Sequence, residues 1–150
     1  MSYLLLAIDY SKSFKYIGLV AARESVIKSN DFLNRSSWVK HIADLPKREK
    51  VAYLHRFPSR LARVRDYLER ILVVSSIESA NSAVTDLAPT TVLVDDTLYS
   101  HIQHPRKVRE SRVKERHRRV LISLADNVAY YAYWVLEVRK RPRELERILK

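Results

Sequence analysis

The stretch LLLAIDYSKSFKYIGLVAA, residues 4–22, contains two apolar runs joined by a short polar segment. The first run ends in a carboxylate, Asp9, and the second, KYIGLVAA at 15–22, has the composition of a strand. Between them, SKSF at 11–14 is typical of a turn. The stretch therefore predicts a β-hairpin. Because ESVIKSNDFL at 24–33 has strand character as well, we expect the chain to open with a three-strand antiparallel meander.

The middle of the chain, residues 36–70, is predicted to be helical. Pro46 and Pro58 divide this region, so two or three helices are expected rather than a single long one. The clearest helical pattern is PSRLARVRDYLERI at 58–71, which begins with Pro and Ser and continues with apolar residues at helical spacing.

Strands and helices alternate in the remainder of the chain. RILVVSSI at 70–77 predicts a fourth strand, ESANSAVTDLAP at 78–89 a short helix, and TTVLVDD at 90–96 a fifth strand. A helical pattern then runs from about 106 to 140. These elements predict one α/β domain spanning residues 1–150, with a mixed five-stranded sheet and a long C-terminal helix.

The composition narrows the classes of function. Twenty-eight Lys and Arg against seventeen Asp and Glu give a net charge of +11, which favours a polyanionic partner, most commonly nucleic acid. An anionic lipid surface and simple solubility are the alternatives. The absence of cysteine excludes disulfides, thiolate metal sites and a cysteine nucleophile. The only glycine is Gly18, so the chain has no glycine-rich phosphate loop of the Rossmann or P-loop kind.

Two further expectations follow from composition. No run approaches the roughly eighteen apolar residues that a membrane span needs, and the opening run reads as a strand rather than a signal peptide, so we expect a cytoplasmic protein without a membrane partner. The few thermolabile residues, with one Met, one Gln and four Asn, and the many charged residues are typical of a protein from a thermophile.

Four aspartates stand at positions that suggest a shared site. Asp9 ends the first predicted strand, Asp95 and Asp96 end the last one, and Asp126 lies within the apolar stretch ISLADNVAYYAYW of the long helix. Ligands of α/β sheets usually bind at the carboxyl ends of strands. Clustered carboxylates repel unless a cation lies among them, and hard oxygen donors without Cys or His suit Mg²⁺ or Mn²⁺. Glu78, after the fourth strand, is a further candidate ligand.

Each of these residues also has a purely structural interpretation. Asp9 and the Asp95–Asp96 pair are residue types that commonly begin turns, and Glu78 is favourable at a helix N-terminus. Asp126 is harder to explain, because its helical neighbours form a packing surface and a buried carboxylate needs a partner. An arginine from residues 60–70 is the structural alternative to a cation for Asp126.

Three segments together resemble the RNase H-like superfamily of nucleases, and within it the YqgF/RuvX family of RuvC-like proteins. LLLAIDYSKSFKYIGLVAA is similar to the family's first strand, its Asp and its following hairpin; TTVLVDDTLYS is similar to a strand that ends in Val-Asp-Glu; and SLADNVAYYAYWVLE is similar to the terminal helix with its Asp. The helical middle, 36–70, is not matched. The matching residues are Asp9, Lys15, Ile17, Gly18, Val94, Asp95, Asp126, Val128, Ala129 and Leu136, with Asp96 in place of the family's Glu.

The resemblance implies an RNase H-like fold and a metal-dependent nuclease that cleaves branched DNA or precursor ribosomal RNA, with Asp9, Asp95, Asp96 and Asp126 as metal-binding and catalytic residues. Two metal ions would then hold the attacking and leaving oxygens of a phosphodiester. The chain departs from the family at Tyr10–Ser11, where a glycine is expected, and at SSIES after the fourth strand. These departures support an alternative, a catalytically inactive nucleic-acid-binding or assembly module. Junction-cutting members act as dimers, which makes a homodimer one expected assembly.

The segment HPRKVRESRVKERHRRV is strongly basic and is predicted to form a helical extension around 104–120 that contacts phosphates without reading sequence. Solvated Glu–Arg pairs are the alternative. The C-terminal tail, 139–150, is a second basic cluster. The residues expected to contact nucleic acid are Lys12, Lys15, Arg106, Lys107, Arg109, Arg112, Lys114, Arg116, Arg118 and Arg119.

Overall fold

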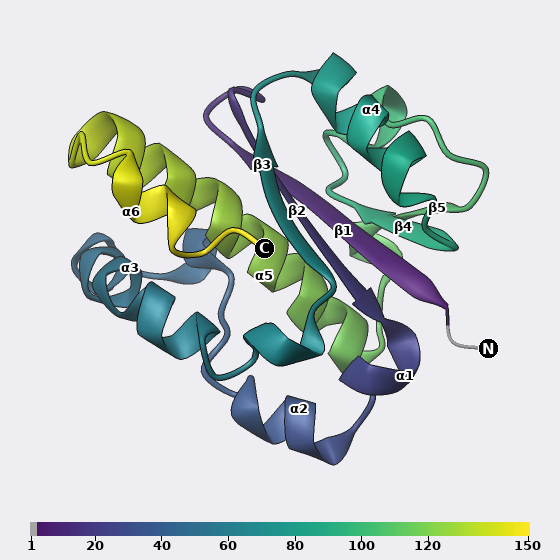
Figure 1. Ribbon diagram of the computed structural model, residues 1–150, viewed down its shortest axis with the longest axis horizontal. Coiled ribbons are helices and arrows are strands. Elements are labelled where there is room, and N and C mark those ends of the chain that lie inside the picture. The colour runs from purple at the N-terminus through teal and green to yellow at the C-terminus, as the bar shows by residue number, and fades with distance from the viewer. Residues whose placement is uncertain (1–2) are drawn as a thin grey trace.

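The chain folds around a mixed five-stranded sheet, seen in a computed structural model that describes residues 3–150 (Figure 1). The strand order is β3-β2-β1-β4-β5, in which β1, β2 and β3 are antiparallel neighbours and β4 and β5 run parallel to β1. The predicted α/β class with five strands is therefore confirmed. The strands are β1 (Leu4–Ser11), β2 (Tyr16–Arg23), β3 (Arg70–Val74), β4 (Thr91–Val94) and β5 (Lys107–Arg109).

Helices lie on both faces of this sheet (Figure 1). The longest, α5, packs on β1 and β2 and continues into a π-helical turn, Trp134–Val138, so the predicted long C-terminal helix is also confirmed. The α-helices are α1 (Glu24–Ile27), α2 (Asn30–Arg35), α3 (Lys47–Leu61), α4 (Ile77–Leu87), α5 (Arg116–Tyr133) and α6 (Arg143–Glu146). Single 3-10 turns are η1 (Ile42–Asp44), η2 (Arg65–Tyr67), η3 (Tyr99–His101) and η4 (Glu110–Arg112).

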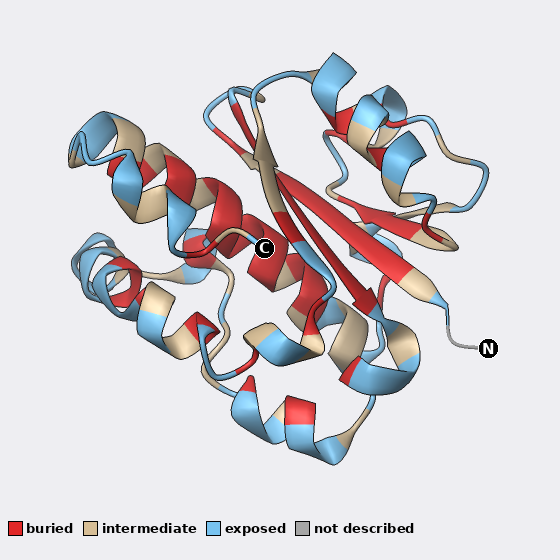
Figure 2. Ribbon diagram, in the orientation of Figure 1, coloured by how far each residue is buried: buried red, intermediate tan, exposed pale blue. Residues whose placement is uncertain are grey.

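Alternate residues of β1 divide the core into two layers. Leu5 and Ala7 belong to the larger cluster, which includes α5, whereas Leu6 and Ile8 belong to the cluster beneath α4. Because side chains alternate along a strand, Asp9 continues the row of Leu5 and Ala7 and faces α5. Figure 2 shows that buried residues concentrate in β1, β2 and α5, so the carboxylate of Asp9 lies at the end of the best-shielded part of the molecule.

The predicted third strand at 24–33 is wrong, because this segment forms α1 and α2. The hydroxyl of Ser29 accepts a hydrogen bond from the backbone N–H of Phe32 and so caps α2, a local bond that competes with strand pairing. Ile27 and Phe32 are completely buried in the larger cluster. The third strand of the meander is instead β3, which was predicted as the fourth strand at 70–77.

The predicted α-helices are also wrong for residues 62–71 and for residues 106–115. Pro58 lies inside α3 rather than at the start of a helix, and the chain leaves α3 after Leu61 to enter β3 at Arg70. In the second segment, β5 pairs with β4 and thereby satisfies the backbone groups along the outer side of β4. The basic segment 104–120 is consequently a loop, an edge strand, a 3-10 turn and the start of α5, not a projecting helix.

Gly18 allows α5 to approach the sheet unusually closely. Gly18 pairs with Asp9 across the β1–β2 ladder, and a Cβ built at this position would lie 2.5 Å from the carbonyl oxygen of Ala125 and 2.9 Å from the backbone nitrogen of Ala129. No side chain fits in this space. The contact places the residue after Ala125, which is Asp126, beside the end of β1.

We expect Gly18→Ala to destabilise the protein by about 1–3 kcal/mol, because a backbone-to-backbone contact cannot move aside for the added methyl group. Thermal unfolding followed by circular dichroism measures this loss. The exposed Val26→Ala is the matched control and should leave the midpoint within about 2 °C of the parent protein. An unchanged midpoint in Gly18→Ala would show that α5 does not depend on this close approach.

Candidate metal centre

Asp9 is a buried carboxylate in which one oxygen lacks a hydrogen bond. The residue is 3% exposed, and its Oδ1 accepts a hydrogen bond of 2.7 Å from the backbone N–H of Tyr10. Its Oδ2 accepts no hydrogen bond from any residue in 3–150. Burial, followed by the negative charges of Asp126 and Asp95, raises the pKa of Asp9 from 3.8 to about 9. Without a cation nearby, this carboxyl is therefore protonated at neutral pH.

Asp126 lies across from Asp9 and is held by neighbouring polar groups. Its Oδ2 accepts a hydrogen bond of 2.8 Å from the backbone N–H of Ile42 and one of 3.3 Å from the side-chain amide of Asn127. The Asp126 carboxylate is therefore paired with a backbone N–H and an imidazole, and not with the arginine from residues 60–70 that was the structural alternative. Burial raises the pKa of Asp126, and His41 together with the two hydrogen bonds counteracts part of this effect.

His41 connects the two aspartates. Its Nε2 lies 3.4 Å from Oδ1 of Asp126 and 3.7 Å from Oδ2 of Asp9. The residue precedes η1 in the segment between α2 and α3, and its side chain is about three-quarters buried. One ring nitrogen therefore faces a carboxylate oxygen from β1 and another from α5.

Glu110 is the third residue of the group and follows the edge strand β5. It begins η4 directly after β5, and its Oε1 is a second buried carboxylate oxygen that accepts no hydrogen bond within residues 3–150. Burial raises the pKa of Glu110, as do the charges of Asp95 and Asp126, whereas His41 lowers it. One ligand atom from each of Asp9, His41 and Glu110 lies within 4.8 Å of the others, so the three residues could hold a metal ion.

The other predicted acidic residues take different positions. Asp95 follows β4 and is close enough to raise the pKa of Asp9, but its Oδ1 accepts backbone hydrogen bonds from Thr97 and Leu98 and so also forms the turn that was its structural interpretation. Asp96 is exposed, and its pKa is lowered first by a hydrogen bond from the side chain of Ser111 and then by one of 3.1 Å from the backbone N–H of the same residue.

Glu78 is separated from this group. It is exposed in the first turn of α4, a helix that covers the opposite face of the sheet from α5 (Figure 1). The structure therefore brings together Asp9 and Asp126, with Asp95 nearby, but leaves Glu78 outside the cluster that includes His41 and Glu110.

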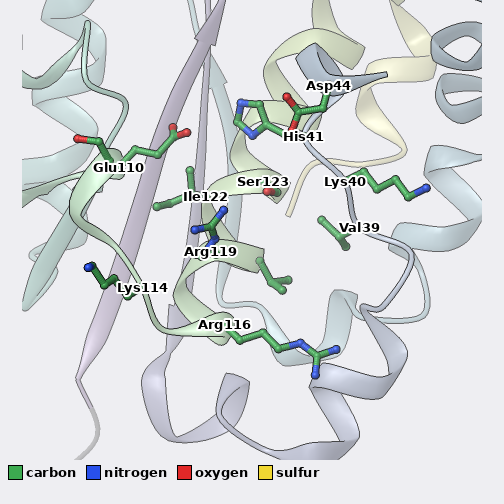
Figure 3. A pocket seen from close by; sticks show the side chains of 12 residues that line it. Val39, Lys40, His41, Asp44, Glu110, Lys114, Arg116, Arg119, Ile122 and Ser123 are labelled. Carbon is green, nitrogen blue, oxygen red and sulfur yellow. The ribbon is translucent and has the colours of Figure 1, made fainter. Parts of the chain in front are cut away.

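A cleft of about 540 Å³ leads to this group from the N-terminal half of α5. Figure 3 shows His41 and Glu110 on opposite walls of the cleft, with Arg119 on the α5 segment between them. Four cationic side chains line the cleft together with these residues. They are Lys40, Lys114, Arg116 and Arg119.

The remaining predicted basic residues are divided among other contacts. Arg118 donates hydrogen bonds to Glu24 at 2.7 and 3.0 Å, which tie α5 to α1 and hold the pKa of Glu24 near 2. Lys107 and Arg109 both lie over the ring of Tyr99.

At the β1–β2 hairpin, Lys12 lies over the ring of Tyr133 and Lys15 is 3.2 Å from a carboxylate oxygen of Glu137. Arg106 and Arg112 are exposed. Of the ten predicted residues, only Lys114, Arg116 and Arg119 line the cleft, and Lys40 joins them without having been predicted.

Two residues of the candidate centre, His41 and Glu110, are absent from the sequence-based prediction. Glu110 lies in a segment whose basic character predicted a helix, so its position at the end of a strand was hidden. His41 lies in the segment 36–70 that matches no motif. One sequence signal pointed to the strand before Glu110, because the apolar Val108 stands between two charged residues. An alternation of three residues is too short to identify a strand.

Searches of family models, of curated proteins and of solved structures found no protein or family that matches this chain. Among the residues that the structure describes, no helix is both long enough and apolar enough to span a membrane.

Proposed function

We propose that this protein is a divalent-cation-dependent nuclease of the RNase H-like type, acting on structured nucleic acid. The observation that carries the proposal is the pair of buried carboxylate oxygens, Asp9 Oδ2 and Glu110 Oε1, which accept no hydrogen bond and adjoin His41 at the end of a basic cleft. Unpaired buried carboxylates are costly, and a cation is the ligand that compensates two of them at once.

The topology supports this proposal. Three antiparallel strands followed by two strands parallel to the first, with a long terminal helix packed on β1 and β2, is the arrangement that the resemblance to the RNase H-like superfamily implies. The positions of Asp9 near the end of β1, Asp95 after β4 and Asp126 on α5 agree with those from which that resemblance expects acidic residues to converge.

The residues present suit a divalent cation. Asp9, His41 and Glu110 would hold it, with Asp95 and Asp126 as neighbouring negative charges, and Mg²⁺ or Mn²⁺ are the ions proposed. Bound there, such an ion supplies Lewis acidity for the attack of water on a phosphodiester. In that hydrolysis one P–O bond to water forms and the P–O bond to the leaving sugar oxygen breaks, which leaves a phosphomonoester and a free hydroxyl group.

The chain's own contribution would be to place the phosphodiester. Lys114, Arg116 and Arg119 line the cleft beside Glu110, and Lys40 lines it next to His41. Cations in this arrangement bind phosphates flanking the cleavage point without reading base sequence. The cleft therefore gathers part of the net charge of +11 at one place beside the candidate metal centre.

The alternative function is a catalytically inactive nucleic-acid-binding module of the same fold. Two contacts favour it: Asp96 accepts a hydrogen bond from the backbone of Ser111, and His41 lies between Asp9 and Asp126, where an imidazolium would offset one of their two negative charges without a metal ion.

Cleavage of labelled branched DNA and of structured RNA in the presence of Mg²⁺ or Mn²⁺ tests the proposal. We expect cleavage that chelation abolishes and that Glu110→Gln reduces at least about a hundredfold, because the amide cannot supply the second carboxylate. The control is Glu146→Gln, which changes an exposed glutamate on α6 and should leave cleavage unchanged. Equal cleavage by Glu110→Gln and the parent protein would contradict the proposed site, whereas binding without any cleavage would select the inactive module.

The basic cleft makes a separate prediction about binding. We expect a double variant, Lys114→Ala with Arg119→Ala, to weaken nucleic-acid binding about tenfold or more and to reduce the salt dependence by roughly two phosphate contacts. Arg48→Ala with Arg63→Ala removes the same charge from exposed positions outside the cleft and is the matched control. Fluorescence anisotropy at several salt concentrations measures both effects. Equal losses in the two double variants would show that only net charge matters.

A further inference from the structure

The loop that carries His41 is fixed on both sides of that residue. Before it, the carbonyl oxygen of Lys40 accepts a hydrogen bond of 2.8 Å from the side-chain amide of Asn127. After it, the backbone N–H of Ile42 donates to Asp126 at 2.8 Å. The hydroxyl of Tyr53 accepts a hydrogen bond of 3.1 Å from the backbone N–H of Lys40 and donates one of 2.5 Å to Asn127 Oδ1.

This network is buried and joins three separate parts of the chain. Asn127 is 0% exposed and Tyr53 is 7% exposed, so their polar groups are directed to the loop rather than to water. Such fully bonded buried networks hold one arrangement, because each lost bond leaves a buried polar group unpaired. The backbone on either side of His41 is therefore fixed, and the imidazole stays near the carboxylates of Asp9 and Asp126.

An imidazole nitrogen changes the chemistry of an otherwise all-oxygen cluster. Mg²⁺ is hard, loses its water reluctantly and prefers oxygen ligands, whereas first-row transition ions bind sites that contain nitrogen with an affinity that rises from Mn²⁺ towards Cu²⁺. The group that could hold an ion contains one nitrogen ligand, from His41, among the oxygens of Asp9 and Glu110.

We propose that His41 makes this centre select a first-row transition ion such as Mn²⁺ over Mg²⁺, and that Tyr53 and Asn127 are the positioning residues that hold it for this purpose. The inference deepens the proposed function, and it rests on that proposal only in requiring that the centre bind a divalent cation. His41 is the ligand that determines metal preference, and Asp9 and Glu110 supply charge for either ion.

The test uses the full chain and measures Mn²⁺ binding by electron paramagnetic resonance, alone and in competition with Mg²⁺. We expect His41→Asp, which replaces nitrogen by carboxylate oxygen, to retain Mg²⁺ binding and to lower the Mn²⁺-to-Mg²⁺ affinity ratio at least about tenfold. Pulsed measurements on the parent protein should show coupling between bound Mn²⁺ and an imidazole nitrogen, which disappears in His41→Asp. His101→Asp changes an exposed histidine and is the matched control.

Tyr53→Phe separates positioning from ligation, because it keeps the ring against Trp38 and removes only the hydroxyl that bonds the loop. We expect it to weaken Mn²⁺ binding about tenfold, as is usual when a group that orients a ligand is lost, with a smaller effect on Mg²⁺. A purely structural role would lower the unfolding temperature without changing the Mn²⁺-to-Mg²⁺ ratio, and this result would overturn the positioning role.

The failures of the two proposals are distinguishable. If bound Mn²⁺ shows no nitrogen coupling, or if the affinity ratio is the same in His41→Asp, the role of His41 is overturned while the cation-dependent nuclease stands. If the parent protein binds neither ion, both proposals are overturned.

Discussion

Asp9→Asn is expected to stabilise the cation-free protein and at the same time to abolish cation binding and cleavage. In the unfolded chain, Asp9 ionises near its ordinary pKa of 3.8, whereas the folded protein keeps it protonated up to a pKa of about 9. The protonated side chain of Asp9 therefore contributes its full stability below about pH 4. This contribution is lost progressively as the pH rises towards 9. At pH 7 the raised pKa of Asp9 therefore lowers the free energy of unfolding by up to about 4 kcal/mol. An uncharged asparagine does not cause this loss.

We expect Asp9→Asn to gain about 1–3 kcal/mol at pH 7, because the asparagine amide will not satisfy every bond in this buried position. For a chain of 150 residues this corresponds to a rise in the unfolding midpoint of roughly 3–10 °C. Added Mn²⁺ should stabilise the parent protein and not the variant. Cleavage should fall by about a thousandfold or more, because a carboxylate that holds the cation is missing.

The control for this prediction is Asp86→Asn, which changes an exposed aspartate on α4 and should alter neither stability nor cleavage. Differential scanning calorimetry with and without Mn²⁺ and a cleavage assay at pH 7 make the measurement. A lower unfolding midpoint for Asp9→Asn, together with cleavage equal to that of the parent protein, would mean that Asp9 is a structural residue.

The second large effect concerns pH and cation affinity. Burial raises the pKa of Asp9 to about 9 and also raises the pKa values of Glu110 and Asp126. A cation must displace at least the proton of Asp9, so the apparent affinity should increase about tenfold per pH unit below 9. Between pH 6 and pH 8 we therefore expect Mn²⁺ to bind roughly a hundredfold more tightly.

Calorimetric titration in two buffers of different ionisation enthalpy measures this dependence and the number of protons released. In the control variant Glu146→Gln the dependence should be unchanged. Mn²⁺ affinity that stays constant from pH 6 to pH 8, with no proton release, would show that the cation does not bind at Asp9.

The sequence was sufficient to predict that acidic residues from distant parts of the chain approach one another. Asp9 lies near the C-terminal end of an apolar strand, so its place towards the carboxyl end of β1 follows from the pattern of that strand. Asp126 lies in an apolar stretch of the predicted long helix, whereas the contact at Gly18 that fixes where this helix meets the sheet is visible only in the structure. Both inferences rest on strong local signals, namely a continuous apolar run for the strand and an apolar stretch for the helix.

The sequence was not sufficient to predict which residues complete the centre. Glu110 follows a strand of only three residues that exists because β4 offers an unpaired side, a tertiary effect without a local pattern. His41 reaches the aspartates because Asn127, Tyr53 and Asp126 hold its loop through hydrogen bonds between segments that are distant in the chain. Asp126 was predicted only as a metal ligand, but it also has a structural role. One of its carboxylate oxygens bonds the backbone of the His41 loop, and the other faces the imidazole.

The most direct test of the central claim is a crystal structure of the protein equilibrated with Mn²⁺ at about pH 8, with anomalous scattering used to locate the ion. We predict an anomalous peak bonded to a carboxylate oxygen of Asp9, to Nε2 of His41 and to a carboxylate oxygen of Glu110. A structure from crystals saturated with Mn²⁺ in which no ion contacts Asp9 or Glu110, and in which His41 still lies between Asp9 and Asp126, would contradict the account.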